Sequence, residues 1–219
     1  MPVLSEANTL GDVLKYETPN LYSREAVTVL AGAGAARVLT VGTVIGRRVK
    51  SSVTVTADAG NTGDGVASLA TPGIGTEAEV GVYTLTCIAA ATFEVLTPRG
   101  YKLPDLTVGQ AYAGAHLALT IADGATDFIV GDKITVTVAG DGKVVALDVT
   151  MVDGAHEAAG IVAADVTAPD GVDAEGFAIV RDAILADHAL VWPAGITQPE
   201  KDAALAALLA LGILVREGA

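Results

Sequence analysis

Cysteine, aromatic residues and positive charge are all scarce in this chain of 219 residues. Cys87 is its one cysteine, which excludes an intrachain disulfide and gives no sign of an oxidising compartment. Phe, Trp and Tyr make up only 4% of the sequence, and Ala, Val and Leu dominate its apolar residues. This composition favours thin, closely packed layers over a deep pocket lined with rings.

The shortage of basic residues limits the possible partners. Acidic residues number 26 and basic residues 13, so the formal net charge is −13. Proteins that bind polyphosphates need Lys and Arg to displace counterions, so we expect no nucleic-acid partner and no anionic lipid partner. The charge is uneven: residues 1–49 sum to +1, residues 50–149 to −6 and residues 150–219 to −8. The first segment is either a flexible leader of ordinary composition or a segment that lies against another protein.

Targeting and membrane segments are also missing from the sequence. Its start, MPVLSEANTLGDVLKYE, lacks a basic stretch followed by an apolar run, so no signal peptide is expected. No run approaches the ~18 apolar residues of a membrane span. The sequence predicts a soluble protein that is made in the cytoplasm and has no membrane partner.

The chain divides into an amino-terminal arm and two segments of different character. Residues 1–20 contain Pro2, Gly11 and Pro19 with scattered apolar groups, which predicts a flexible, extended arm with little to bury. Residues 26–30 and 38–45 read as strands on either side of a Gly-rich turn. We therefore expect 21–49 to start a β-rich body.

Residues 50–149 alternate apolar and polar residues between Gly- and Asp-containing turns. The period of two is clear in 83–87, 117–121 and 134–138, and no helical pattern interrupts it. The segment predicts an inserted all-β, sandwich-like domain. Cys87 falls on the apolar side of its strand and is expected to be a buried thiol.

Residues 150–219 combine short strands with one helix. Strands are expected at 161–164, 176–180, 189–192 and 213–215. Thr197 and Glu200 form a capping box at the start of the helix, with Pro199 in its first turn. Its apolar stripe is predicted to consist of Leu205, Leu208 and Leu209. The fold class is therefore mainly β with one C-terminal helix, plus the inserted β-domain.

No arrangement of residues indicates catalysis or a cofactor. His116, His156 and His188 are far apart and lack metal-ligand spacing. Residues 32–37 begin like a dinucleotide fingerprint but have Arg37 in place of the third Gly. No Gly-x-Ser-x-Gly elbow is present, and Cys87 has no activating neighbour. We expect no catalytic residue, no cofactor and no enzyme activity.

The acidic loop 58–65 is one candidate metal site. Its Asp and Asn spacing invites a calcium site, but Gly60 and Thr62 occupy ligand positions and no Glu stands at the twelfth place. A turn between strands is the favoured interpretation, and a loop calcium site is the minor alternative.

Several stretches resemble a known family. Residues 187–197 (DHALVWPAGIT), the Ala/Leu helix and 212–216 (GILVR) look like the ending of lambda-type phage head decoration proteins. Residues 157–162 (EAAGIV), 14–17 (LKYE) and 21–28 (LYSREAVT) are similar to other parts of that family. The resemblance covers residues 12–49 and 150–219. Within the interposed residues 50–149, the stretches 81–87, 91–95 and 124–132 are similar to a β-module inserted in various phage structural proteins.

The resemblance implies a function as well as a fold. It implies a homotrimer on the outer surface of the expanded virion capsid, which binds the major capsid protein and stabilises the head against internal DNA pressure. The arm residues expected to bind the capsid are Asn8, Leu10, Val13, Leu14 and Tyr16. The residues expected in the body core or trimer region are Trp192, Pro193, Leu205, Leu208 and Leu209.

The insert 50–149 keeps a second function open. It interrupts a body formed by 21–49 and 150–219, and it could project outward as an adhesion module for host-cell glycan or protein. Head binding by a chain without the insert would favour decoration, whereas host-cell binding by the insert alone would favour adhesion.

Overall fold

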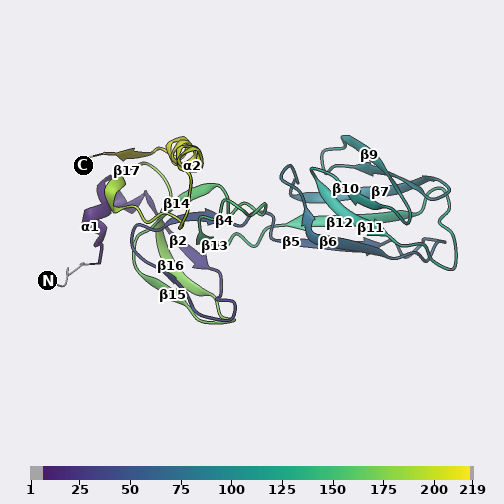
Figure 1. Cartoon of the computed structure of the whole chain (residues 1–219), viewed down its shortest axis with the longest axis horizontal. Coiled ribbons are helices and arrows are strands. Elements are labelled where there is room, and N and C mark those ends of the chain that lie inside the picture. The colour runs from purple at the N-terminus through teal and green to yellow at the C-terminus, as the bar shows by residue number, and fades with distance from the viewer. Residues whose placement is uncertain (1–6, 218–219) are drawn as a thin grey trace. The chain divides into compact units, whose positions relative to one another are not determined.

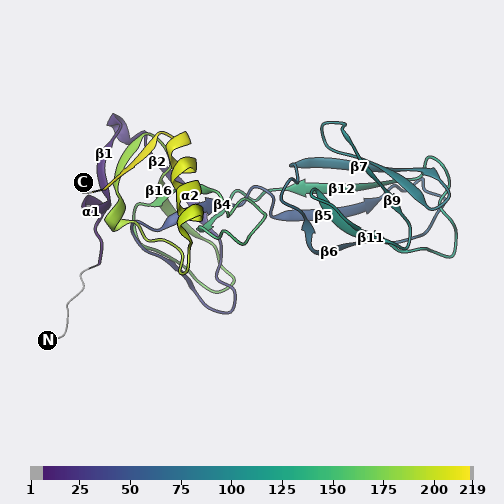
Figure 2. The ribbon, with the colours of Figure 1, turned by 45° about the horizontal axis from the view of Figure 1, so that its top comes forward.

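A computed structural model describes residues 7–217 as two compact units. Unit 1 contains the chain up to Arg48 and from Gly142 onward, and unit 2 contains Val49–Asp141. Strands dominate both units (Figures 1 and 2). The predicted fold class, mainly β with one long C-terminal helix, is confirmed. No helix within residues 7–217 is long and apolar enough to cross a membrane.

Unit 1 is built on a closed five-stranded barrel in the order β13-β2-β16-β14-β4. The strands are Arg24–Val29 (β2), Val44–Arg47 (β4), Val144–Ala146 (β13), Ala158–Val162 (β14) and Ala174–Ile179 (β16). β13 runs parallel to β2, and the other pairs are antiparallel. Because β13 closes this barrel, the C-terminal boundary of the expected insert moves from residue 149 to Asp141.

A second sheet and the long helix lie against the barrel. Leu14–Glu17 (β1), Ala183–Ala186 (β17) and Ile213–Arg216 (β18) form a sheet in the order β1-β17-β18. Helix α2, Gln198–Ala210, contacts β14 and β18. The remaining elements of unit 1 are α1 (Leu10–Val13), η1 (Pro19–Leu21), β3 (Arg37–Leu39), β15 (Val166–Ala168) and η2 (Asp187–Ala189).

Two apolar cores hold unit 1 together. One lies inside the barrel and includes Val29, Ile45 and Val144, all fully buried. The other lies between the barrel, the β1-β17-β18 sheet and α2, and includes Val13, Ile161 and Leu208. Small and β-branched residues fill both cores, as expected for a chain with few rings.

Unit 2 contains a five-stranded sheet, β5-β12-β7-β8-β9, and a three-stranded sheet, β10-β11-β6. The strands are Ser52–Ala57 (β5), Ala67–Ile74 (β6), Gly81–Ala89 (β7), Thr92–Leu96 (β8), Lys102–Thr107 (β9), Ala111–Ala113 (β10), Leu117–Ile121 (β11) and Lys133–Ala139 (β12). Alternate residues of β7, β11 and β12 are buried, as the period of two predicted. Cys87 is a fully buried thiol on β7, and burial raises its pKa.

The strand predicted at 189–192 is wrong. Residues Asp187–Ala189 form the short helix η2, and Val191 makes a single bridge to Thr43. The amide of Val191 donates to Gly42 O, and Val191 O accepts from Val44. Pro193 then offers no amide for a further ladder bond, so the pairing ends after one residue.

Candidate functional site

The amino-terminal segment is attached to unit 1 from Asn8 onward. Asn8 Nδ2 donates to Ala189 O at 2.9 Å. The amide and hydroxyl of Thr9 both donate to the Asp12 carboxylate, at 2.8 and 2.7 Å, and begin helix α1. These two donors lower the pKa of Asp12, because they stabilise its charged form.

The expectation of an extended arm with little to bury is wrong for the described part of residues 1–20. Val13 is fully buried in the core beside α2, and Leu10 and Leu14 pack against the same core. Strand β1 pairs with β17, so its backbone groups are satisfied within the unit. Pairing with a strand some 170 residues away overrides the low apolar content of the segment. Residues 1–6 of the predicted arm lie outside the described residues.

Tyr16 differs from Leu10, Val13 and Leu14 because its side chain is 54% exposed. It lies on β1, an outer strand of the β1-β17-β18 sheet. The register of β1 against β17 shifts between Leu14 and Tyr16, which indicates a bulge at this point. The structure thus brings Leu10, Val13 and Leu14 into the core and leaves Tyr16 at the surface.

Trp192 lies in the segment that connects η2 to α2. Its ring packs against the same core as Val13, and Lys201 Nζ lies 5.1 Å from the ring centroid. Lys201 also forms an ion pair with Asp187 at 3.1 Å, which holds the start of α2 to η2. Trp192 Nε1 is buried and has no hydrogen-bond partner in unit 1. Pro193, the next predicted residue, lines a groove of about 740 Å³ together with Arg37, Arg48 and Glu200.

Helix α2 starts with the predicted capping box and buries only part of the predicted stripe. Thr197 N and Oγ1 donate to Glu200 at 2.8 and 2.7 Å, which lowers the pKa of Glu200. Leu208 is fully buried and Leu205 is half-buried, but Leu209 is 59% exposed. Leu209 is therefore not part of the core of unit 1, where Ala204 lies one turn before Leu208, and its expected place in the trimer region stays a prediction.

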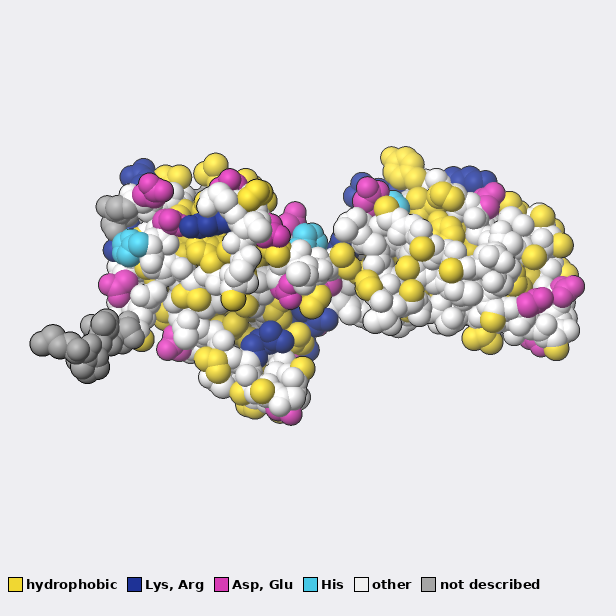
Figure 3. All heavy atoms as spheres, viewed as in Figure 1, with side chains coloured by type: hydrophobic (Ala, Val, Ile, Leu, Met, Phe, Trp, Pro, Cys, Tyr) yellow, Lys and Arg dark blue, Asp and Glu magenta, His cyan; other side chains and the backbone are white. Residues whose placement is uncertain are grey.

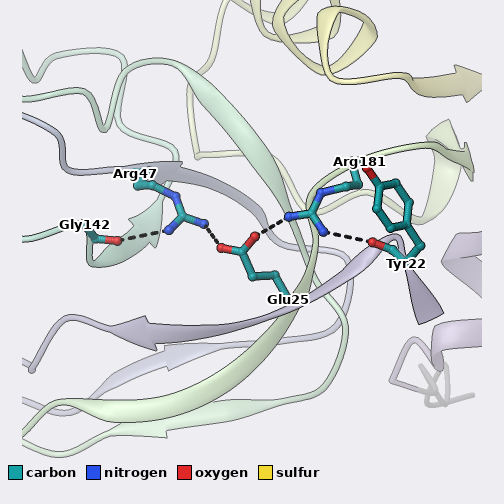
Figure 4. A network of polar contacts seen from close by, with 5 residues as sticks. All are labelled: Tyr22, Glu25, Arg47, Gly142 and Arg181. Atoms are coloured by element: carbon teal, nitrogen blue, oxygen red, sulfur yellow. Dashed lines mark hydrogen bonds and ion pairs between the residues drawn. The ribbon is translucent and has the colours of Figure 1, made fainter. Parts of the chain in front are cut away.

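Three charged residues that the sequence analysis did not single out form a network across unit 1 (Figure 4). Glu25 on β2 accepts from Arg47 Nη2 at 2.9 Å and also forms an ion pair with Arg181. Arg181 donates to Tyr22 O at 2.9 Å and lies over the Tyr22 ring, 5.3 Å from its centroid. No local pattern could have predicted this network, because Arg181 is 156 residues from Glu25.

The carboxylates in and beside the loop 58–65, which was considered for calcium, accept backbone hydrogen bonds. Asp132 accepts backbone amides from Thr62, Gly63 and Ile129 at 2.9–3.0 Å, and these bonds lower its pKa. Asp58 and Asp64 likewise accept backbone amides. Among residues 7–217, no three acidic, His or Cys side chains are grouped to hold a metal. These acidic groups stabilise turns.

Solved structures match part of the chain. Two crystal forms of FlgL from Xanthomonas campestris match with 23% and 22% identity and TM-scores of 0.32. The matches cover 45% and 48% of this chain, and the chain spans about a third of FlgL. The search of curated proteins gives no significant match.

The family comparison covers nearly the whole chain. The model for bacteriophage lambda head decoration protein D matches residues 3–213, which include all of unit 2 and most of unit 1. This family is structural and is located on the virion capsid. The chain belongs to the bacteriophage lambda head decoration protein D family.

Proposed function

We propose that this protein binds the outer surface of an expanded phage head as a homotrimer and stabilises the shell against internal DNA pressure. The observation that carries the proposal is the family match over residues 3–213. The fold supports a structural role, because the charged groups described above are used in turns, caps and ion pairs within each unit.

The proposed capsid contact is smaller than the 20-residue arm expected from the sequence. Residues 8–17 are held to unit 1, so we place the contact on residues 1–7 and on the outer edge of β1. A coat-protein strand that pairs along this edge would meet the exposed Tyr16. Tyrosine is among the residues that contribute most to protein interfaces, since its ring is large and its hydroxyl can bond.

Three linked contacts would make the attachment strong. Each subunit offers one such edge, and once one subunit is bound the others face the lattice at high effective concentration. Linkage of this kind raises overall affinity by roughly 10²–10⁴-fold over a single contact. The net charge of −13 per chain would also keep decorated particles apart in suspension.

The test adds purified full-length protein to expanded heads that lack it, followed by sedimentation and cryo-EM. Bound density on the outer surface, and heads that survive higher temperature with DNA inside, are expected. Deleting residues 2–6 should abolish binding without unfolding unit 1, because Asn8 and the Thr9 cap remain. Tyr16→Ala should weaken binding, and Val172→Ala, at a loop position 57% exposed, is its matched control.

Two results would contradict the proposal. Normal head binding by both the deletion and Tyr16→Ala would move the capsid contact elsewhere. Failure of the wild-type chain to bind heads, together with binding of unit 2 to host cells, would instead favour the adhesion function.

A further inference from the structure

The turn that joins β1 to β2 has an unusual backbone. Asn20 and Leu21 both adopt left-handed conformations, with φ values of 63° and 59°. Glycine adopts this region freely and asparagine tolerates it, but in leucine the Cβ atom crowds the backbone and the conformation is strained. Unit 1 therefore keeps Leu21 in a conformation that its own side chain disfavours.

A third left-handed residue lies beside this turn. Among residues 7–217, four residues other than glycine have a positive φ, and three of them are Asn20, Leu21 and Asp182. Asp182 O accepts hydrogen bonds from the hydroxyls of Ser23 and Thr18, at 2.8 and 3.3 Å. Residues in strained conformations gather at binding sites, where the surrounding structure fixes them. The cluster therefore makes this surface of unit 1 a candidate binding site.

The residues that follow Leu21 hold the turn in place. Arg181 donates to Tyr22 O at 2.9 Å and lies over the Tyr22 ring (Figure 4). The amide of Val180 donates to Ser23 O at 2.9 Å, and Ser23 is fully buried. Because these contacts and those of Asp182 fix the backbone around Leu21, the strain is not released by a shift of the turn.

Leu21 gains little burial within the subunit from this conformation. Its side chain is 58% exposed, although burial is what usually stabilises a leucine. Figure 3 shows hydrophobic side chains at many places on the surfaces of both units, so exposure by itself does not distinguish Leu21. Exposure together with strain does, because the subunit maintains an unfavourable conformation that presents an apolar side chain to the outside.

Leu21 lines an apolar groove in unit 1. The groove has a volume of about 440 Å³, and Phe177, Ala163 and Ala164 also line it. Phe177 is 58% exposed, as Leu21 is. The short side chains of the two alanines leave the groove unfilled. Its size and lining therefore suit one large apolar side chain from a partner.

The two charged residues of the groove, Arg24 and Glu25, are paired within the subunit. Arg24 donates to both carboxylate oxygens of Glu17, at 2.8 and 2.7 Å. Glu25 forms ion pairs with Arg47 and Arg181. A charged group that entered the groove would find no unpaired partner, and its burial would be costly. The groove therefore favours an uncharged occupant.

The place of the groove favours the capsid as the source of that occupant. Glu17 ends β1, the strand whose outer edge is the proposed contact with the coat protein. The ion pair between Glu17 and Arg24 joins this strand to the groove at 2.7 Å. Because the family binds the phage capsid, one coat-protein segment can serve both the strand edge and the groove.

We propose that a coat-protein segment pairs with the outer edge of β1 and, further along, places an uncharged apolar side chain between Leu21 and Phe177. This inference rests on the capsid binding of the proposed function and adds a second contact to it. The strained turn holds Leu21 at the groove before the capsid is bound. Binding therefore needs no rearrangement of the turn, which is the advantage of a preorganised site.

The test compares two glycine substitutions in the turn and two substitutions at exposed apolar residues. Leu21→Gly removes the side chain at the groove and the strain together, because glycine adopts the left-handed region freely. Asn20→Gly changes the adjacent left-handed residue and keeps the Leu21 side chain. Phe177→Ser removes the ring that lines the groove, and Val172→Ser is its control at a loop position that is 57% exposed.

Each full-length variant competes with labelled wild-type protein for expanded heads that lack decoration, and urea denaturation followed by Trp192 fluorescence measures its stability. Leu21→Gly should have a urea midpoint no lower than that of the wild type, because its strain is relieved. Leu21→Gly and Phe177→Ser should bind heads roughly tenfold more weakly, as expected for the loss of an interface anchor. Asn20→Gly and Val172→Ser should bind as the wild type does.

Three results would overturn this inference. Normal head binding by Leu21→Gly or by Phe177→Ser would show that the groove does not meet the capsid. A lower urea midpoint for Leu21→Gly would show that Leu21 serves the fold of the subunit. A changed oligomeric state of Leu21→Gly in sedimentation velocity would assign the groove to a second copy. Failure of the wild type to bind heads would overturn the proposed function as well, whereas normal wild-type binding confines the failure to the groove.

Discussion

Replacing Leu208 by Ala tests whether α2 is part of the unit 1 core. Leu208 is fully buried, in contact with a core that includes Val13, Ile161 and Ile213. The substitution removes about three methylene equivalents, worth ~2.4 kcal/mol at ~0.8 kcal/mol each. The cavity left behind adds to this loss, so the free energy of unfolding of unit 1 should fall by ~3–4 kcal/mol, within the ~2–5 range for buried Leu→Ala changes.

Urea denaturation followed by Trp192 fluorescence measures this change. Trp192 is the only tryptophan and packs on the same core, so it reports unit 1. With an m-value of ~2 kcal/mol/M, the urea midpoint should drop by roughly 1.5–2 M. Protein concentration must be held constant, since subunit association adds to apparent stability.

Val172→Ala is the control for Leu208→Ala, because Val172 is 57% exposed in a loop of the same unit. Its free energy of unfolding, calculated from the urea midpoint, should differ from that of the wild type by no more than ~0.5 kcal/mol. An unchanged midpoint for Leu208→Ala would refute the placement of α2, since no compact core loses three buried carbons at no cost.

Three further predictions concern the barrel, the carboxylates and unit 2. In β4, the added Cβ of Gly46→Ala would clash with the carbonyl oxygen of Ala155. The free energy of unfolding should therefore fall by ~1–3 kcal/mol in the same urea assay. The control is Gly11→Ala, whose added Cβ meets only ordinary contacts and should leave the midpoint unchanged. Hydrogen bonds from Arg24 lower the folded-state pKa of Glu17, and those from Thr197 lower that of Glu200. The two carboxylates therefore stabilise the fold above the unfolded-state pKa of about 4.3, and this stabilisation is lost as the pH falls through their lower folded-state pKa. The urea midpoint of the wild type should fall between about pH 5 and pH 2. In Glu200→Gln it should fall less steeply, because one of the two carboxylates is gone. Residues 49–141 expressed alone should unfold in one cooperative denaturant transition; a gradual, non-cooperative loss of structure would show that unit 2 depends on unit 1.

Elements defined by local signals were predictable from the sequence. Helix α2 has its cap, first-turn proline and terminal glycine within sixteen residues, and the structure places it at Gln198–Ala210. The strands of unit 2 alternate apolar and polar residues, because one face of each sheet meets the other and the opposite face meets solvent. In both cases neighbouring residues carry all the information.

Elements defined by distant pairing were not predictable. The scattered apolar groups of residues 1–20 predict an extended arm, yet Leu14–Glu17 form strand β1, which pairs with β17. The period-two pattern and the polar junction near residue 150 predict that residues 144–146 belong to the insert, yet as strand β13 they close the barrel of unit 1. Its partners, β2 and β4, lie about a hundred residues earlier in the chain.

The exposure of Leu209 likewise depends on packing against elements distant in the sequence. The spacing of Leu205, Leu208 and Leu209 predicts one stripe that faces one core, but the residues of α2 buried in that core are Ala204 and Leu208. A soluble helix with a single buried face needs charged residues on the other face, and 203–211 has none. The absence of charge therefore did not distinguish the buried positions of α2 from its exposed ones. The contacts of α2 with β14 and β18, which no local pattern shows, decide that Leu208 is buried and Leu209 exposed.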